Sequence, residues 1–494
     1  MPKKHCNDWD IDCNNYLSHT HHRRHATLVN TIIGALNACL LNIQLSQHMN
    51  KYITLYLLSL AALAGHAQDF DTKPTLELGN KEQDVKFTIG ARMMTDAAYY
   101  HSDFTPMHSG AALTDARIRT SMTYRNWYFY ADFGFGKGKF DQKNIFLQYA
   151  VKDKHEGNHT VKVGYYTDPA GSMARLTSLG SYHFISRAGA ANALGTGREL
   201  GATYKYTNKH VTAYQGVFAE NQYNKVDAGI NGVSVAGRWV VRPISTTDQT
   251  LHLGLNMRYA HLGGGETYNN VLKKSLSLGQ SLETYVDENQ DFSSCTLDWA
   301  NNTFDVGAEA LYHNKRFFVR GEYRHKLVTK KRDSKTLFEA SNDNIDTWGT
   351  LSAWEAANPL RTNHFNGGYV EAGFLIFGSP YHYDTNEAVL GGLKGKALEV
   401  VARYNYTGLN DINKGEYFSA GRNQYYPDGY MADYPYNSSS VGGGNVNSFT
   451  VGLNYSFNKY AQVMLNYTLH KVDKDFLPYD KTIHALQARV LFSF

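Results

Sequence analysis

The side chains best suited to chemistry in this sequence are basic, and they gather in one stretch that is almost free of carboxylates. The stretch and its end hold four of them: Arg175, His183, Arg187 and Arg198. Asp168 is the only acidic residue between positions 168 and 197. Guanidinium groups bind carboxylate and phosphate oxygens in a bidentate fork. In a water-filled passage this stretch would attract anions; the alternative is that its arginines pair with acidic neighbours such as Glu199 and hold it in place.

Motifs of known catalytic sites do not occur in the sequence. It has no G-x-S-x-G elbow, no P-loop and no H-E-x-x-H pair, and its acidic residues and histidines are scattered. We therefore expect no enzyme, no cofactor and no metal centre. A net charge of +4 over 494 residues, evenly dispersed, also argues against a nucleic-acid-binding protein.

The elements that must position the basic side chains are predicted to be strands. Residues 461–470 (AQVMLNYTLH) alternate apolar and polar side chains, which places one face of a strand against an apolar medium and the other against water. The chain is rich in strand-forming Tyr (36) and Phe (24) and poor in Pro (10). Sixteen segments have this character: 84–100, 113–124, 127–136, 143–151, 159–167, 198–206, 210–219, 230–242, 250–261, 303–312, 316–325, 366–377, 397–406, 446–457, 459–472 and 482–494.

The connections between these segments alternate in length. The long ones follow odd-numbered strands: 101–112, 168–197, 262–302, 326–365 and 407–445. Most others are short turns, with 378–396 as the exception. The pattern predicts an all-β fold, a 16-stranded antiparallel transmembrane β-barrel with long extracellular loops and short periplasmic turns. In large barrels of this kind the loop after the fifth strand commonly folds inward, so 168–197 is expected to be an inward-folded constriction loop. A large soluble β-sandwich or propeller fits the alternation but not the one-sided loops.

The alternation also assigns a lipid face and an inner face. In 113–124, Ala116, Ile118, Met122 and Tyr124 are predicted to face outward. Predicted basic residues of the lumen include Arg92, Arg117, Arg119, Lys162, Arg258, Arg320 and Arg403. They slightly outnumber the predicted lumen carboxylates, which indicates a weak anion preference.

The N-terminal part has the layout of a secretory signal. Asn50-Lys51 precedes an apolar run and a small-x-small site, so cleavage after Ala67 is expected. The predicted organisation is an upstream extension at 1–48 that precedes a start at Met49, a signal peptide at 49–67, a short periplasmic segment at 68–83 and a barrel at 84–494. The extension carries Cys6, Cys13 and Cys39 among histidines, but their spacing matches no zinc template. Mean hydropathy is −0.45, and no apolar run of spanning length follows residue 70.

The chain ends in a strand with alternating apolar residues and a terminal aromatic residue, Phe494. Such an end resembles the signal by which the barrel-assembly machinery of the outer membrane recognises its clients.

Several short stretches resemble the phosphate-selective porin O and P family over roughly residues 84–494. They include Ala116-Arg117-Ile118-Arg119, Asn144-Ile145-Phe146-Leu147-Gln148-Tyr149, Tyr182-His183-Phe184, Gly197-Arg198-Glu199-Leu200-Gly201 and Ala402-Arg403-Tyr404. The resemblance implies a sixteen-stranded trimeric channel of the cell outer membrane, and it accounts for 378–396 as a long periplasmic turn. Family members that select phosphate have a dense run of arginines. Here Arg175 and Arg187 lie in the matching loop, and the neighbouring small residues carry no charge.

The resulting expectation is a porin for passive diffusion of small hydrophilic solutes, with a preference for anions that include phosphate or polyphosphate. Its expected partners are outer-membrane lipid, the barrel-assembly machinery, small anionic solutes and two further copies of the chain, without nucleic acid. The alternative is a surface-binding or adhesion barrel. Its loops 262–302, 326–365 and 407–445, rich in Tyr, Asn and Gly, would contact carbohydrate or a partner.

Overall fold

The computed structural model describes most of the chain after residue 75. The described residues are 76–80, 84–220, 232–263, 266–268, 271–341, 350–357, 360–412, 440–474, 477 and 479–494. The predicted extension 1–48 and signal peptide 49–67 lie outside the described residues. So does 413–439, which is most of the loop 407–445 that the surface-binding alternative invokes.

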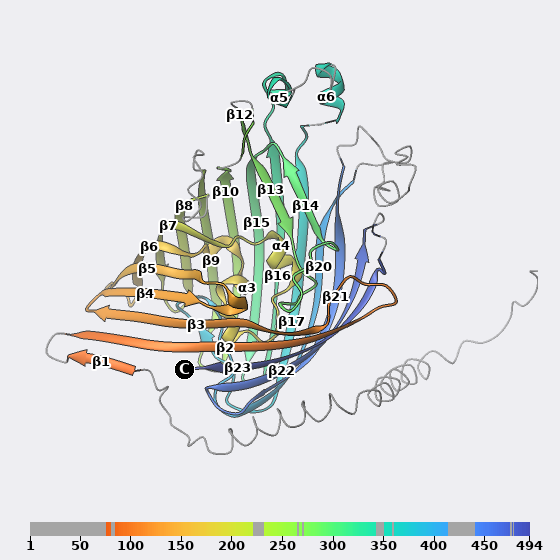
Figure 1. Cartoon of the computed structure of the whole chain (residues 1–494). Helices are drawn as coiled ribbons and strands as arrows, with labels where there is room; N and C mark the ends of the chain where they lie inside the picture. Colours follow the sequence, from red (N-terminus) through yellow and green to blue (C-terminus); the bar gives the residue numbers. More distant parts are fainter. Residues whose placement is uncertain are drawn as a thin grey trace, which may run out of the picture. The chain divides into compact units, whose positions relative to one another are not determined.

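Within the described residues, sixteen long strands form one antiparallel sheet that closes on itself (Figure 1). Each strand pairs with the next in the chain, and the last pairs with the first. The strands are β2 (Val85–His101), β3 (Gly110–Tyr124), β4 (Trp127–Gly134), β5 (Asp141–Lys152), β6 (Asn158–Thr167), β7 (Arg198–Thr207), β8 (Val211–Ala219), β9 (Val233–Ser245), β10 (Gln249–His261), β15 (Ala300–Asn314), β16 (Phe317–Lys330), β17 (Asn363–Phe377), β20 (Ala397–Asp411), β21 (Val441–Ser456), β22 (Ala461–Asp473) and β23 (Thr482–Ser493). The fold is the predicted 16-stranded barrel, and all sixteen predicted segments correspond to strands.

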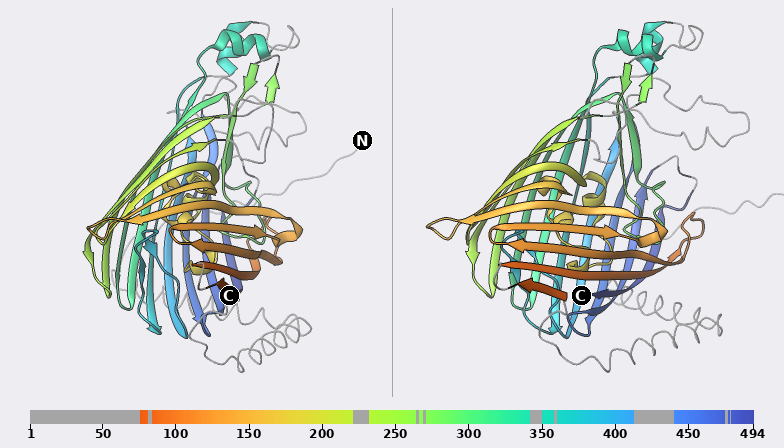
Figure 2. Two further views of the ribbon diagram at one scale, coloured as in Figure 1. Left: turned by 90° about the vertical axis from the view of Figure 1, so that its left-hand side faces the viewer. Right: turned by 60° about the vertical axis from the view of Figure 1, so that its left-hand side comes forward.

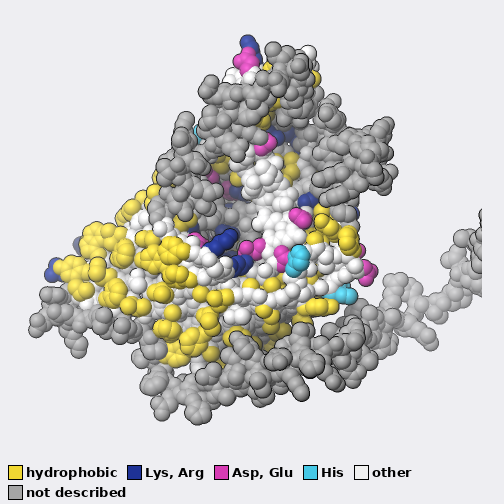
Figure 3. All heavy atoms as spheres, in the orientation of Figure 1, with side chains coloured by type: hydrophobic (Ala, Val, Ile, Leu, Met, Phe, Trp, Pro, Cys, Tyr) yellow, Lys and Arg dark blue, Asp and Glu magenta, His cyan; other side chains and the backbone are white. Residues whose placement is uncertain are grey.

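The outer surface of the barrel is apolar because alternate side chains of each strand point away from the interior. Ile118 and Met122 of β3 are 46% and 41% exposed, and Leu465 and Tyr467 of β22 are similar. Figure 3 shows hydrophobic side chains gathered over the outside of the strands. A closed ring with an apolar exterior satisfies every strand edge and suits a bilayer.

The closing seam contains an element that the alternation does not predict. β1 (Leu76–Asn80) pairs with the start of β2, whereas β23 pairs with β2 from Arg92 onward. Between the two pairings, the backbones of Ala91 and Phe494 exchange two hydrogen bonds of 3.0 Å. β1 therefore pairs with the part of β2 that extends past the last residue of β23. The predicted periplasmic segment 68–83 thus includes a strand.

One rim of the barrel carries tight turns. The turn between β3 and β4 has two residues, and Arg125 adopts a left-handed φ of 51°, as primed hairpin turns require. The other rim carries β11 (Glu266–Tyr268), β12 (Val271–Lys273), β13 (Ser275–Gly279), β14 (Ser294–Asp298), α5 (Ser334–Ser341) and α6 (Leu351–Ala357). The two helices lie together at this rim (Figure 2), where Leu337 and Trp354 pack with Trp299. No helix among the described residues is long and apolar enough to cross a membrane.

The connection 168–197 lies inside the ring. Its short helices α3 (Met173–Leu176) and α4 (Gly189–Leu194) are enclosed by strands in Figure 1. α4 packs against β16, β17 and β20, and the 3₁₀ turn Pro169–Gly171 packs against β9 and β10. From the turn rim, the connection 378–396 also enters, with the short strands β18 (Tyr383–Asp384) and β19 (Val389–Leu390).

Candidate functional site

Carboxylates of the barrel wall hold the loop 168–197 against one side of the interior. The Oε1 atom of Glu322 on β16 accepts hydrogen bonds from the backbone N–H of Ala174 (2.8 Å) and the hydroxyl of Ser172 (3.0 Å). The hydroxyl of Tyr369 on β17 donates to the same oxygen. Since Ser172 also caps α3 through the N–H of Ala174, the start of this helix is fixed to the wall.

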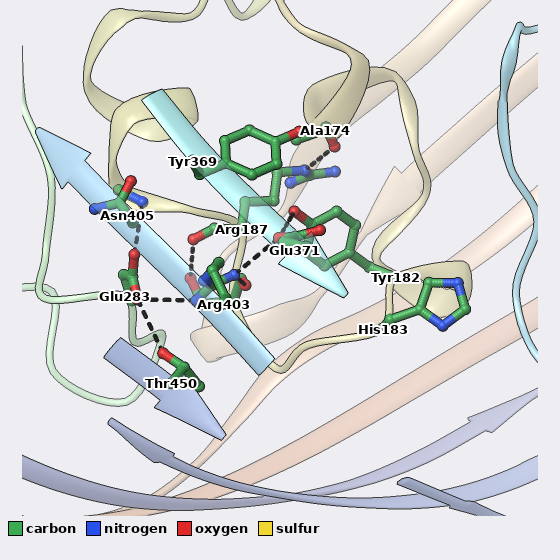
Figure 4. Close-up of polar contacts among 12 residues, drawn as sticks. Ala174, Tyr182, His183, Arg187, Glu283, Tyr369, Glu371, Arg403, Asn405 and Thr450 are labelled. Carbon is green, nitrogen blue, oxygen red and sulfur yellow. Dashed lines mark hydrogen bonds and ion pairs between the residues drawn. The ribbon is translucent and has the colours of Figure 1, made fainter. Parts of the chain in front are cut away.

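A second carboxylate, Glu371 on β17, joins the loop to two wall arginines, Arg320 and Arg403, of which Figure 4 shows Arg403. The Tyr182 hydroxyl donates to Glu371 Oε1 at 2.6 Å, and Arg320 Nε donates to Oε2 at 2.6 Å. Arg403 Nη1 lies 3.3 Å from Oε1 and also donates to the backbone oxygen of Ser186 at 2.7 Å. These groups are buried, so the hydrogen bonds and ion pairs offset the cost of removing the charges from water.

A third carboxylate comes from a different connection. Glu283, in the stretch between β13 and β14, is buried and accepts from the N–H of Gly189 at 2.9 Å and from Arg403 Nη2 at 2.9 Å. Two loops therefore meet inside the barrel and share Arg403 (Figure 4). Sequence reasoning missed Glu283, because an isolated acidic residue in a long connection carries no local signal of its position.

His183 does not face the open interior. Its Nε2 lies 3.1 Å from the backbone oxygen of Gly391, its Nδ1 lies 2.8 Å from Glu399 Oε1, and its ring packs 4.8 Å from that of Phe318. In Figure 4 its ring points away from Arg187 and Arg403. Because the ring is buried and both nitrogens are engaged, His183 is not available to a passing anion. This corrects the prediction of His183 as an anion-binding residue.

The connection 378–396 fills the turn-side end of the interior. Arg238 Nη1 and Nη2 donate to the backbone oxygens of Glu387 (3.0 Å) and Ala388 (2.8 Å), and Lys205 Nζ donates to that of Asn386 (3.0 Å). The Tyr383 hydroxyl lies 2.8 Å from Nδ1 of His252. This irregular connection is therefore an ordered inner element held by β7, β9 and β10.

The two halves of the wall differ in how far their inward side chains are covered. Inward residues of β17 to β23, such as Asn405, Glu399 and Asn454, are 0% exposed beneath the loops. Several inward residues of β3 to β6, such as Arg119, Tyr130 and Phe146, are half-buried, while Asp132 and Thr160 on the same strands are buried. Part of the interior along β3 to β6 is therefore accessible to solvent.

Many of the predicted lumen arginines are paired with carboxylates. Arg92 contacts Asp115 at 2.6 Å, and Arg117 contacts Asp115 and Asp132 at 2.8 and 2.9 Å. Arg320 and Arg403 share Glu371, as described above. Arg258 meets three acidic groups: Asp168 (3.1 Å), Glu199 (2.8 Å) and Glu220 (2.5 Å). Glu199 is thus bound by Arg258 and not by an arginine of the loop.

Five other basic residues have no ion pair with any described residue. These residues, which we call the basic face, are Arg119, Lys162, Arg175, Arg187 and Arg198. Arg187 donates from Nε and Nη2 to the backbone oxygens of Ala174 (2.7 Å) and Thr177 (2.9 Å). Arg198 Nε donates to Asn144 Oδ1 (2.7 Å). Their charges are therefore not neutralised by the groups that orient them.

Three members of the basic face, Arg175, Arg187 and Arg198, lie close enough for their charges to repel one another. Burial, together with the charges of Arg187 and Arg198, lowers the pKa of Arg175 to about 10, so the group stays charged at neutral pH. A Cβ placed on Gly197 would lie 3.7 Å from Nη2 of Arg175, which locates this guanidinium over the start of β7. Loop and wall arginines thus converge where the loop faces the open side.

Within the described residues, no group of three or more His, Cys, Asp or Glu is arranged to hold a metal ion. The arrangement can orient and attract a charged solute.

Comparisons with known proteins place the chain in a family. No curated protein sequence matches it. Among solved structures it is similar to OmpT of Vibrio cholerae, with a TM-score of 0.47 and 10% identity over 85% of this chain and 100% of that chain. It is also similar to an anion-selective porin from Comamonas acidovorans, with a TM-score of 0.47 and 10% identity over 83% of this chain and 100% of that chain. For the outer-membrane channel DcaP of Acinetobacter baumannii, the TM-score is 0.46 and the identity is 11%, over 84% of this chain and 99% of that chain.

The family comparison covers nearly the whole barrel. Residues 87–494, from the first long strand to the end of the chain, match the family described as phosphate-selective porin O and P. This match agrees with the closed barrel and its apolar exterior, and it indicates a channel in the outer membrane. The chain therefore belongs to the phosphate-selective porin O and P family.

Proposed function

We propose that this outer-membrane channel passes small hydrophilic solutes by passive diffusion and prefers anions, phosphate and polyphosphate among them. The observation that carries the proposal is the basic face. Its members line the open side of the interior without an ion pair to any described residue, whereas most wall arginines elsewhere are paired. Transport would involve no catalytic step.

The paired and unpaired charges have different effects on a passing ion. A guanidinium that is bonded to a buried carboxylate presents little net field, because the two charges cancel at a distance. An unpaired guanidinium in a narrow aqueous passage attracts anions and repels cations, and rings of basic side chains give anion preference in known pores. Arg119, Arg175 and Arg198 lie where this field acts on solute.

The path along the basic face also favours oxyanions. Arginine presents several N–H donors in a planar fork that matches phosphate geometry. Arg187 uses Nε and Nη2 on backbone oxygens, so it stabilises the loop as well as contributing charge. Arg175 has no hydrogen bond to a described residue and is the clearest donor to solute.

Family membership also supports a homotrimer. We propose that three copies of the barrel associate in the membrane, each with its own passage. The mass of the purified complex in detergent tests this assembly: a mass of three chains is expected, and a monomer would contradict it.

Reversal potentials in planar bilayers under a KCl gradient test the anion preference. The wild type is expected to show an anion-selective sign. Arg175→Gln and Arg119→Gln should each lower the permeability ratio of chloride to potassium by about two- to threefold, and more in combination. The matched control is Arg332→Gln, which removes the same charge from an exposed position beyond β16. A cation-selective wild type, or variants identical to the control, would contradict the proposal.

A further inference from the structure

Three aromatic side chains of β4 and β5 face the open interior beside the basic face. Tyr128, Tyr130 and Phe146 are half-buried and alternate with lipid-facing residues such as Trp127 and Phe129, which are 44% and 37% exposed. We call Tyr128, Tyr130 and Phe146 the aromatic strip. An anion channel needs only charge and water in its passage, so this strip is not explained by the function proposed above.

The rings of the strip lie side by side and present a gently curved surface. The ring centroids of Tyr130 and Phe146 are 5.3 Å apart with 25° between the ring planes, and those of Tyr128 and Tyr130 are 6.3 Å apart with 28°. Between Tyr128 and Phe146 the angle grows to 52°. Tyr130 is therefore the middle of a strip whose neighbouring rings are nearly parallel.

The adjacent wall leaves no side chain over the Phe146 backbone. Phe146 pairs across the sheet with Gly164, whose φ is 144°. A Cβ at this glycine would lie 2.3 Å from the backbone oxygen of Ile145 and 2.6 Å from the Cα atom of Phe146. Only glycine fits this close approach, so β6 stays flat beside the strip.

A positive charge sits on the strip. The Nζ atom of Lys162 lies 4.6 Å from the centroid of Phe146 and 5.1 Å from that of Tyr166, and it has no ion pair with a described residue. On the other side, Arg119 pairs in register with Asp132, two residues from Tyr130 along β4. A cation without a close ion pair to a described residue therefore stands on each side of the ring surface, and Lys162 also lies within range of the more distant charge of Glu387.

Three hydroxyl groups near the strip are engaged with one another. The Thr88 and Ser121 hydroxyls are hydrogen-bonded, and the Tyr128 hydroxyl bonds to Ser121. A sugar ring needs many free hydrogen-bonding partners, whereas an aromatic ring needs an apolar face at stacking distance. The strip favours the aromatic ring.

We propose that the aromatic strip, with Lys162 and Arg119, is a binding subsite for aromatic carboxylates of about the size of benzoate. The ring stacks on Tyr130 and Phe146, and the carboxylate lies against Lys162 or Arg119. Register places Arg119 farther than Tyr130 from the tight turn between β3 and β4, so a solute from the long-loop rim meets the arginines first. This inference rests on the proposed anion channel and names one class of its solutes.

Block of chloride current tests the subsite in the full-length channel in planar bilayers. Benzoate is compared with cyclohexanecarboxylate, which has the same charge and similar size but no π face, and with inorganic phosphate. In the wild type, benzoate should half-block the current at a concentration about tenfold lower than cyclohexanecarboxylate does, as two stacking contacts would give.

Variants assign the effect to the strip. In Tyr130→Leu/Phe146→Leu the ratio between the two half-blocking concentrations should fall to about one, and in Tyr130→Leu alone to about three. Phe129→Leu, on the lipid face of the same strand, should keep the wild-type ratio. If the double variant forms no channels, the single variant decides.

The outcomes separate this inference from the proposed function. Equal block by the two carboxylates in the wild type, or an unchanged ratio in Tyr130→Leu, would overturn the subsite while the KCl reversal potential still reports anion preference. A cation-selective reversal potential in the same bilayers would overturn both.

Discussion

At the scale of single residues, the charged side chains inside this barrel fall into two groups. Some are paired and hold the loops in place, and others are unpaired and can act on a solute. Buried carboxylates such as Glu371 and Glu283 accept from loop backbone or loop side chains and from wall arginines at the same time. If the loop moved away, a buried charge in such a pair would lose its partner, which is energetically costly. The pairs therefore strongly favour one position of the loop. The unpaired guanidinium of Arg175 has no such partner among the described residues and is held by packing against the small residues around Gly195.

Glu371→Gln tests the supporting role at this scale. The substitution leaves Arg320 without its carboxylate, so we expect a loss of about 3–5 kcal/mol in the free energy of unfolding. Thermal unfolding in detergent micelles measures it. Asp248→Asn, whose partner Lys315 is exposed at 3.3 Å, is the control and should change little.

The double variant Arg320→Met/Glu371→Leu removes both charges. It should be more stable than Glu371→Gln, because no buried Arg320 guanidinium is then left without its carboxylate; the loss of the acceptor of the Tyr182 hydroxyl offsets part of this gain. Equal unfolding midpoints for Glu371→Gln and the wild type would show that the network does not support the loop.

At the scale of elements, the connection 378–396 occupies the turn-side interior through a few polar contacts. Glu387 is central, since its Oε1 lies 3.3 Å from Lys205 Nζ and its Oε2 accepts from the Tyr214 hydroxyl at 3.3 Å. Burial by itself raises the pKa of Glu387, but the charges of Lys205 and Lys162 outweigh this effect and hold the pKa at about 2. The element is thus anchored by a carboxylate that stays ionised in mild acid.

The sign of the pH dependence follows from this lowered pKa. The stabilisation by Glu387 is fully present above its ordinary pKa of about 4.3 and is lost as the pH falls toward 2. The difference in unfolding midpoint between the wild type and Glu387→Gln should therefore be present at about pH 7 and shrink toward zero near pH 2. Midpoints across a pH series measure it, with Glu288→Gln as an exposed control. A difference independent of pH would contradict the assignment.

At the scale of the whole molecule, the barrel exists only if the first and last long strands meet. Asp96 and Arg489 face each other across this seam with two hydrogen bonds of 2.6 Å, and both are buried. The Ala91–Phe494 backbone pair lies at the other end of the same pairing. The seam is thus held by the backbone pairing of β2 with β23, by a bidentate ion pair and by the backbone of the last residue. The role of Phe494 as an assembly signal stays a prediction.

Asp96→Asn tests closure of the ring. The substitution leaves the buried Arg489 guanidinium without a carboxylate, and we expect a loss of about 3–5 kcal/mol and a smaller fraction of folded barrel. Folded and unfolded chains are separated by heat-dependent mobility in gels, and urea unfolding gives the free energy. Asp103→Asn, at an exposed loop position, should behave as the wild type.

The sequence by itself determined the barrel. Strict alternation in sixteen segments, tight turns such as 125–126 and long connections such as 168–197 specify which faces meet lipid and which strands are neighbours, because each of these is a local property of the chain. It also located Arg175, Arg187 and Arg198 in or beside the loop that lies in the interior. β1 was not predicted, because a five-residue strand is too short to show a period.

The tertiary structure decided which charges are free. His183 and Arg187 are four residues apart in one loop, yet His183 is enclosed by Glu399 and Gly391, and Arg187 lies toward the open side. Glu283 comes from another loop to bind Arg403, and Arg258 takes the carboxylate of Glu199. Pairing depends on distances between strands and loops that are far apart in the chain, and alternation carries no information about them. For that reason the wall and the residues of the basic face could be predicted from the sequence, whereas the pairing that leaves those residues without a carboxylate, and the aromatic strip beside them, could not.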